Sequence, residues 1–179
     1  MLSRRLPSLV VLTIVACACA QVWTQPATRI DWAAHGADVT HASPAAQITP
    51  ANVSRLQVAW TYRTGDARSD NRSQIQCNPI VIDGVLYATS AQLKVFALDA
   101  ATGVRRWQFD PFAGGEGPGS LGVSRGVTYW REGDDARIFS AAGPYLYALD
   151  AKTGTPVASF GEQGRLGLLQ GLDADTTGL

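Results

Sequence analysis

Short apolar runs separated by turn residues dominate the chain from about residue 79 onward. The runs 80–82 and 85–89 are rich in β-branched and aromatic residues and are joined by Asp83-Gly84. An Asp-Gly pair between two such runs predicts a tight hairpin, because both residues accept the positive φ angles of a primed turn. A third apolar run at 94–98, a second turn at 102–103 and a fourth run at 106–109 complete the unit. The pattern predicts a four-stranded antiparallel meander over about 79–109.

A second unit with the same organisation follows a glycine-rich loop at 114–119. Its predicted parts are a first strand at 126–130, a turn at 131–135, and strands at 137–141, 145–149 and 157–160. This succession of β-rich runs and turns predicts a second meander over about 126–160. The remaining residues, 161–179, show no strand period, and we expect no strand there.

One segment of the first unit recurs in the second. Phe96–Gly103 (Phe-Ala-Leu-Asp-Ala-Ala-Thr-Gly) returns 51 residues later as Tyr147–Gly154 (Tyr-Ala-Leu-Asp-Ala-Lys-Thr-Gly). A period near fifty residues with strand-like flanks is typical of arrays in which each repeat is one small sheet. Such sheets stack radially, because none of them can bury both faces alone. The sequence therefore predicts an all-β fold, a β-propeller, with residues 56–179 forming about two four-stranded blades of it.

An irregular stretch precedes the two units. Residues 21–55 are rich in Ala, Thr and Pro and are expected to form an extended lead-in, with one helical turn near 52–56. The following run, 58–63, alternates apolar and polar residues as a half-buried strand does. Its Trp60-x-Tyr62 matches Trp107-x-Phe109 of the first unit, so both are interpreted as the outermost strand of a blade. Because no inner strands precede Trp60, we expect an N-terminal closing strand whose partners are not in this sequence.

The first twenty residues, 1–20, are interpreted as a signal peptide. Two arginines precede an apolar run at 9–16, and Ala18-Cys19-Ala20 fits a small-x-small cleavage site. The apolar run is too short to span a bilayer permanently. The segment ending at Cys17 also resembles a bacterial lipoprotein box, which would leave a lipid anchor on that cysteine. Plain secretion and membrane anchoring both stay open, and either route places the mature protein outside the cytoplasm, in the periplasm.

Composition argues against nucleic-acid binding, an internal disulfide and a metal site formed by the histidines. Lysine plus arginine equals aspartate plus glutamate at 15 each, so no basic surface for nucleic acid is indicated. Cys77 is the one cysteine outside the signal, which excludes an internal disulfide, and we interpret it as a small apolar residue buried on a strand. The two histidines, His35 and His41, lack a Cys or Glu cluster and are interpreted as surface residues rather than metal ligands. The acidic pairs at 134–135 and 173–175 fit turns and solvated loops.

The repeated segment carries a resemblance to a known family. Ala97-x-Asp99-x-x-Thr102-Gly103-x-x-x-Trp107 resembles the tryptophan-docking motif of the eight-bladed quinoprotein dehydrogenases, which depend on pyrroloquinoline quinone (PQQ). In that motif the Asp caps the turn, the Gly takes a positive φ, and the indole wedges between neighbouring blades. The second copy departs from it, with Ala158 at the tryptophan position. Other segments agree in order with the family: Asp31-Trp32, Gly36, Ser43-Pro44, Gln47-Ile48, Asn52-Val53, Trp60–Asp66, Gln76–Ile80, Gly84–Tyr87 and Arg125–Trp130.

The resemblance implies two cofactor contacts. Arg125 stands in the Arg-Gly segment whose arginine reaches PQQ in the family, and a guanidinium fork suits the carboxylates of that cofactor. Gln76 stands three residues before Pro79, where the family often has Glu, so it retains hydrogen bonding without the charge. Many alcohol-oxidising relatives have two adjacent cysteines at the positions of Gly119 and Ser120. This departure favours the sugar-oxidising, glucose dehydrogenase-like branch.

The resemblance also implies that the Ca²⁺ ligands and the aspartate base of the family lie in later blades, so no catalytic or metal-binding residue is assigned in this chain. The leading expectation is the N-terminal part of a periplasmic PQQ-dependent dehydrogenase that oxidises a sugar, polyol or alcohol. Its electrons would go to a respiratory quinone or cytochrome, and the chain alone is expected to be inactive. The alternative is a non-enzymatic scaffold lipoprotein of the outer-membrane assembly type, a propeller of PQQ-like repeats; a truncated, inactive product is a third interpretation.

Overall fold

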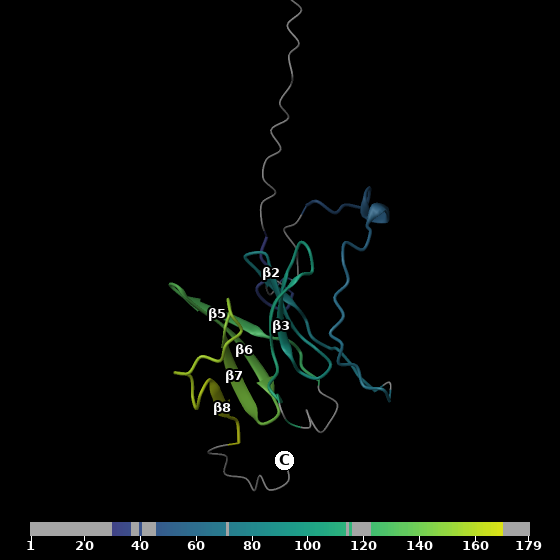
Figure 1. Ribbon diagram of the computed structural model, residues 1–179. Coiled ribbons are helices and arrows are strands. Elements are labelled where there is room, and N and C mark those ends of the chain that lie inside the picture. Colours follow the sequence, from purple (N-terminus) through teal and green to yellow (C-terminus); the bar gives the residue numbers. More distant parts are fainter. Residues whose placement is uncertain are drawn as a thin grey trace, which may run out of the picture.

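The computed structural model describes residues 30–36, 40, 46–70, 72–113, 115 and 123–169. In this part of the chain the strands form two four-stranded antiparallel sheets, each a meander in chain order. The first sheet contains β1 (Ile80–Ile82), β2 (Val85–Thr89), β3 (Val95–Asp99) and β4 (Arg105–Phe109). The second contains β5 (Thr128–Glu132), β6 (Asp135–Ala142), β7 (Tyr145–Asp150) and β8 (Arg165–Gly167). Figure 1 shows the second sheet, in green to yellow, beside the first, in teal, and the all-β prediction is confirmed.

The local turns follow the sequence pattern closely. Asp83 and Gly84 join β1 to β2 with φ angles of 49° and 74°, which confirms the hairpin predicted there. A 3-10 turn, η1 (Val53–Arg55), confirms the helical turn expected in the lead-in. The described residues include no helix that is long and apolar enough to cross a membrane. The predicted signal peptide and most of the glycine-rich loop lie outside the described residues.

Both copies of the repeated segment end in the same turn. The Oδ1 atom of Asp99 accepts hydrogen bonds from the backbone N–H and the hydroxyl of Thr102, both at 3.0 Å. The Oδ1 atom of Asp150 accepts the same pair from Thr153, at 2.7 and 2.8 Å. The glycine after each threonine has a φ of 72° or 74°, a conformation that side chains disfavour. The repeat in the sequence is therefore a repeat in the structure, with the capping roles predicted for Asp and Gly.

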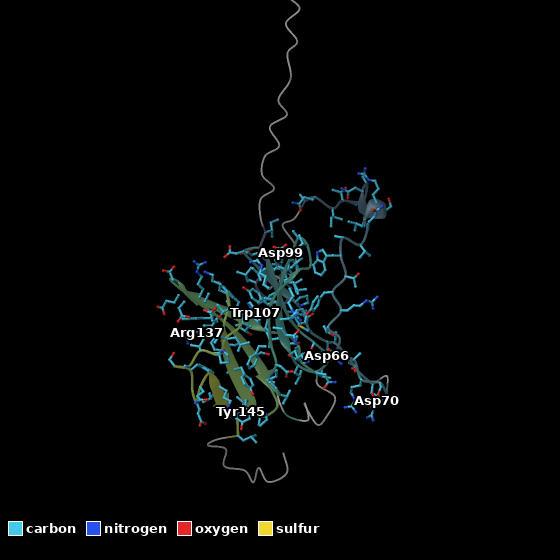
Figure 2. All side chains as sticks on the ribbon, in the orientation of Figure 1. Asp66, Asp70, Asp99, Trp107, Arg137 and Tyr145 are labelled. Carbon is cyan, nitrogen blue, oxygen red and sulfur yellow. The ribbon has the colours of Figure 1, made fainter. Side chains whose placement is uncertain are left out.

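Two tryptophans dock on these turns. The indole N–H of Trp60 donates to the carbonyl of Ala100 at 3.1 Å, in the turn of the first sheet. The indole N–H of Trp107, on β4, donates to the carbonyl of Ala151 at 3.0 Å, in the turn of the second sheet. Each ring covers the glycine of its turn so closely that an added Cβ would lie 2.5 or 2.6 Å from a ring carbon. Figure 2 shows Trp107 between the two sheets, where the resemblance placed it.

Side chains alternate along β3, so both faces of the first sheet are buried. Val95 and Ala97 belong to the cluster between the two sheets, which also contains Leu149 of the second sheet. Phe96 and Leu98 belong to a smaller cluster on the opposite face. The two sheets therefore pack face to face, and a separate element covers the outer face of the first.

That element is the run 58–63, and it is not a strand in the structure. It is extended, yet its backbone pairs with no strand among the described residues. Its side chains nevertheless occupy outer-strand positions, because the Tyr62 ring lies 5.0 Å from that of Phe96, as Phe109 lies 5.3 Å from Tyr147. The predicted strand lacks a ladder because the described part of the chain offers no neighbour for it.

The fourth strand predicted at 157–160 is wrong. The outer strand begins in the register of the first sheet, with Pro156 opposite Leu149, but the chain then turns away. It leaves at Ala158, the position that holds the docking tryptophan in the first unit, so no indole anchors it there. It returns to β7 as β8, which means that the segment 161–179 does contain a strand, contrary to expectation.

The start of the lead-in pairs with the first sheet, which the sequence did not predict. Trp32 exchanges two backbone hydrogen bonds with Val81 of β1, at 2.7 and 2.8 Å, in an antiparallel bridge. One residue earlier, Asp31 Oδ1 accepts a hydrogen bond from the backbone N–H of Asp83 at 3.0 Å. These contacts cover the edge of β1 that β2 leaves open.

Candidate functional site

The inner strands of the two sheets, β1 and β5, begin beside each other. Two residues before each strand, Asn78 and Gly126 form a parallel bridge. The backbone N–H and the side-chain amide of Asn78 both donate to the carbonyl of Arg125, at 3.0 and 3.3 Å. Gly126 has a φ of 137°, and a Cβ there would lie 2.8 Å from the carbonyl oxygen of Asn78. Because only glycine permits this approach, the Arg-Gly segment is fixed against the start of the first sheet.

Arg125 borders a cavity of about 280 Å³. The cavity is lined by residues 33–35 of the lead-in, by Asn78 and Ile80, and by residues 125–128. No carboxylate lies in this lining. Arg125 is exposed, and among the described residues its guanidinium makes no hydrogen bond or ion pair. A guanidinium stays protonated and presents a planar fork of donors, so the wall favours a carboxylate or another anion.

Gln76 is not among the residues that line this cavity. It is half-buried, and its Nε2 donates to Oε1 of Gln74 at 2.8 Å. Only two residues separate it from Asn78, so its backbone belongs to the segment that contacts Arg125. The structure therefore brings Arg125 and Asn78 together, and it does not bring Gln76 into the lining of the same cavity.

His35 is the lining residue that sequence reasoning missed. Its side chain is exposed, as expected, but it borders the cavity of Arg125. It reaches this place because Trp32 pairs with Val81, a contact between segments far apart in the sequence. No local pattern signals such a pairing, so the lead-in offered no way to find it. His41 lies outside the described residues.

The cysteine and the acidic residues take structural roles. Sγ of Cys77 accepts a hydrogen bond from the backbone N–H of Thr89 at 3.2 Å, and the side chain is half-buried against the smaller cluster. Asp135 forms an ion pair with Arg137 at 2.5 Å, and this hydrogen bond holds the pKa of the Asp135 carboxyl below its usual value. Within the described ranges, no three His, Cys, Asp or Glu side chains are grouped to hold a metal ion. The acidic pair at 173–175 lies outside those ranges.

A second cavity, of about 310 Å³, lies between the sheets at their turn ends. Its floor includes Tyr87, whose hydroxyl donates to the carbonyl of Ala151 at 3.2 Å. Burial raises the pKa of Tyr87 to about 12. Arg131 and Asp83 pair across its rim at 3.7 Å. Cations and carboxylates are mixed along this lining. The cavity that Arg125 borders differs, because its lining has no carboxylate.

Comparison with known proteins identifies the family. The family model "PQQ: Glucose/ethanol/alcohol dehydrogenase, beta-propeller domain" matches residues 32–179, which is most of the chain. The match includes both sheets, the docking tryptophans and the Arg125 cavity. The chain therefore belongs to the PQQ-dependent dehydrogenase family, and its two sheets are blades of a β-propeller domain.

Individual relatives agree with this assignment. The chain is 38% identical to the dehydrogenase subunit of the quinone alcohol dehydrogenase of Gluconobacter oxydans, over 72% of this chain and 17% of that protein. It is 31% identical to quinoprotein glucose dehydrogenase A of Acinetobacter calcoaceticus, over 77% of this chain and 20% of that protein. The solved structure of the quinohemoprotein alcohol dehydrogenase of Comamonas testosteroni superposes with a TM-score of 0.62 at 29% identity, over 80% of this chain and 20% of that one.

These relatives are much longer than the chain. It spans 17% of the Gluconobacter oxydans subunit, 20% of glucose dehydrogenase A and 22% of the glycerol dehydrogenase large subunit of Gluconobacter thailandicus. The substrates in their names are alcohol, glucose and glycerol. Membership of a PQQ-dependent dehydrogenase family is thus established, whereas the substrate and electron acceptor of the whole protein are matters for proposal.

Proposed function

We propose that the whole protein carrying this chain is a PQQ-dependent dehydrogenase acting on a CH–OH donor, and that this chain supplies the Arg125 wall of the cofactor site. The observation that carries the proposal is the exposed guanidinium of Arg125, unpaired within the described residues, at a cavity without carboxylates. The Asn78–Gly126 bridge holds the backbone at this position. A charged fork on a rigid strand edge is preorganised for a carboxylate ligand.

The donor set of the cavity fits an anionic cofactor. Arg125 would hold a PQQ carboxylate, and Asn78 and Thr128 add an amide and a hydroxyl to the same wall. Gln76 uses one Nε2 hydrogen on Gln74, so its second Nε2 hydrogen stays available as the donor of the second proposed contact. When bound, PQQ supplies an ortho-quinone that accepts a pair of electrons from the substrate. The residues of this chain bind and orient the cofactor; we assign none of them a role as catalytic base.

For the substrate we propose a sugar, a polyol or an alcohol, with sugars and polyols preferred. Gly119 and Ser120 stand where alcohol-oxidising members have adjacent cysteines, which supports the sugar-oxidising branch. The higher identity to an alcohol dehydrogenase subunit, 38% against 31% for glucose dehydrogenase A, supports alcohols. Dye reduction by the PQQ-loaded whole protein with glucose, glycerol and ethanol separates these options.

The remaining features of the proposal concern parts beyond this chain. We propose Ca²⁺ as the metal, with ligands outside residues 1–179, and a respiratory quinone or cytochrome as the electron acceptor. A relative from Thauera butanivorans is named 1-butanol dehydrogenase (cytochrome c), which supports the acceptor class. The targeting pattern of residues 1–20 supports a periplasmic location, by secretion or by a lipid on Cys17.

The test is equilibrium titration of the whole protein with PQQ in the presence of Ca²⁺. We expect saturable binding that Arg125→Ala weakens at least ~30-fold, roughly the effect of leaving one partner of a charge pair without the other. Arg125→Lys should retain part of the affinity, because it keeps the charge without the fork. Arg55→Ala, at an exposed arginine of η1, is the matched control. Absence of PQQ binding, with no dye reduction by sugars or alcohols, would contradict the proposal and favour a cofactor-free scaffold.

A further inference from the structure

Two residues of the lead-in are held against the inner edge of the first sheet. Trp32 is bound to Val81 by two backbone hydrogen bonds, and Asp31 is bound to the backbone of Asp83. Because the bridge is antiparallel, the residues after Trp32 run back along β1 toward its beginning. That beginning is where Asn78 contacts Arg125. The lead-in therefore delivers residues 33–35 to the cavity.

The lining of the cavity contains residues with hydrogen-bond donors and no carboxylate. The residues with polar side chains in its lining are Arg125, His35, Asn78 and Thr128, and the others are alanines, other apolar residues or glycine. Ala33 and Ala34 are small, so they leave room beside the imidazole. An imidazole ring offers an N–H donor in either protonation state. Donors thus approach the cavity from two segments, with no carboxylate in the lining to oppose an anion.

We propose that His35 is a further ligand-binding residue, which donates a hydrogen bond to an anionic group of the molecule that Arg125 holds. The proposal rests on the proposed function for the identity of that molecule, PQQ, and adds a contact from a segment outside both sheets. It assigns the lead-in a role in binding, in place of the surface role expected for its histidine. The cavity at the turn ends carries no comparable proposal, because cations and carboxylates are mixed along its lining.

Variants of His35 in the whole protein test this contact. We expect His35→Ala to weaken PQQ binding about tenfold, the loss expected for one hydrogen bond to a charged group, with an unchanged melting temperature. His35→Gln keeps a side-chain N–H donor and should recover part of the affinity. An affinity for His35→Ala within twofold of the unmodified protein, while Arg125→Ala still binds poorly, overturns the role of His35 and leaves the proposed function intact. Failure of the unmodified protein to bind PQQ overturns both.

Chemical protection gives a second readout that needs no variant of His35. Diethyl pyrocarbonate modifies accessible imidazoles, and mass spectrometry locates the modified residue. We expect saturating PQQ to slow modification of His35 in the unmodified protein, and we expect no such protection in Arg125→Ala at the same PQQ concentration. An unchanged rate at His35 in PQQ-saturated protein would overturn the proposal, even if His35→Ala failed to fold.

Discussion

At the scale of single residues, Gly65 and Gly103 have nearly the same backbone conformation and different neighbours. Their φ angles are 73° and 72°, but a Cβ on Gly65 would meet nothing within 4 Å, whereas one on Gly103 would lie 2.6 Å from the Trp60 ring. We predict that Gly65→Ala costs about 1 kcal/mol of unfolding free energy, from the left-handed φ alone. Gly103→Ala should cost roughly 2 to 4 kcal/mol, because the docked indole must also move.

Denaturant unfolding of the whole protein, followed by tryptophan fluorescence, measures both losses. Gly65→Ala is the matched control, because it isolates the backbone contribution at the same φ. Equal losses for the two variants would show that the indole does not rest on the turn glycine as the structure has it.

Tyr87 should make the fold sensitive to alkali. Burial raises its pKa from 10.0 to about 12 in the folded state, so between these values the unfolded chain loses the phenolic proton and the folded protein keeps it. Stability from this residue is complete below pH 10 and falls as the pH rises toward 12, by up to about 3 kcal/mol. Tyr87→Phe should flatten this part of the stability profile measured by urea unfolding. An equally steep alkaline loss in that variant would assign the effect to other groups.

The roles of single residues could be predicted from the sequence where they depend on contacts with near neighbours along the chain. Asp99 and Thr102 lie three positions apart, and the Asp99 carboxylate accepts the hydrogen bonds that close the turn, so the sequence pattern sufficed. The docking role of Trp107 was predicted because the segment from Ala97 to Trp107 resembles the tryptophan-docking motif of the family. The orientation of Gln76 toward Gln74 and the position of His35 at the cavity depend on side-chain packing and on a distant strand, which no local pattern encodes.

At the scale of elements, the hairpins were predictable and the outer strand of the second sheet was not. A two-residue turn fixes strand register, so β1 and β2 followed from Asp83-Gly84. In the second sheet the chain leaves at Ala158 and resumes as β8 after a detour. The sequence shows why the chain leaves the sheet there, since an alanine stands at the position of the docking tryptophan. It does not show where the chain pairs again, because that depends on contacts with β7. The run 58–63, predicted as a closing strand whose partners are not in this sequence, pairs with no strand among the described residues.

At the scale of the whole molecule, the two sheets bury each other on one side only. Trp130 on β5 remains 39% exposed, Leu166 on β8 45%, and Val58 beside the first sheet 82%. Exposed apolar residues next to open strand edges favour association between chains. We therefore predict that the isolated 179-residue chain self-associates and has no dehydrogenase activity. Light scattering over a range of concentrations measures the association; a monodisperse monomer with a cooperative melt would refute it.

The pairing of Trp32 with Val81 also sets an order of assembly. A chain is synthesised from its N-terminus, so residues 30–36 exist before β1 does. They have nothing to pair with until β1 and the hairpin that supports it have formed. A segment synthesised before β1 thus reaches its final place only after β1 has formed, and the cavity bordered by Arg125 and His35 is complete only after that step. Folding of the first sheet and completion of this cavity are therefore parts of one sequence of events.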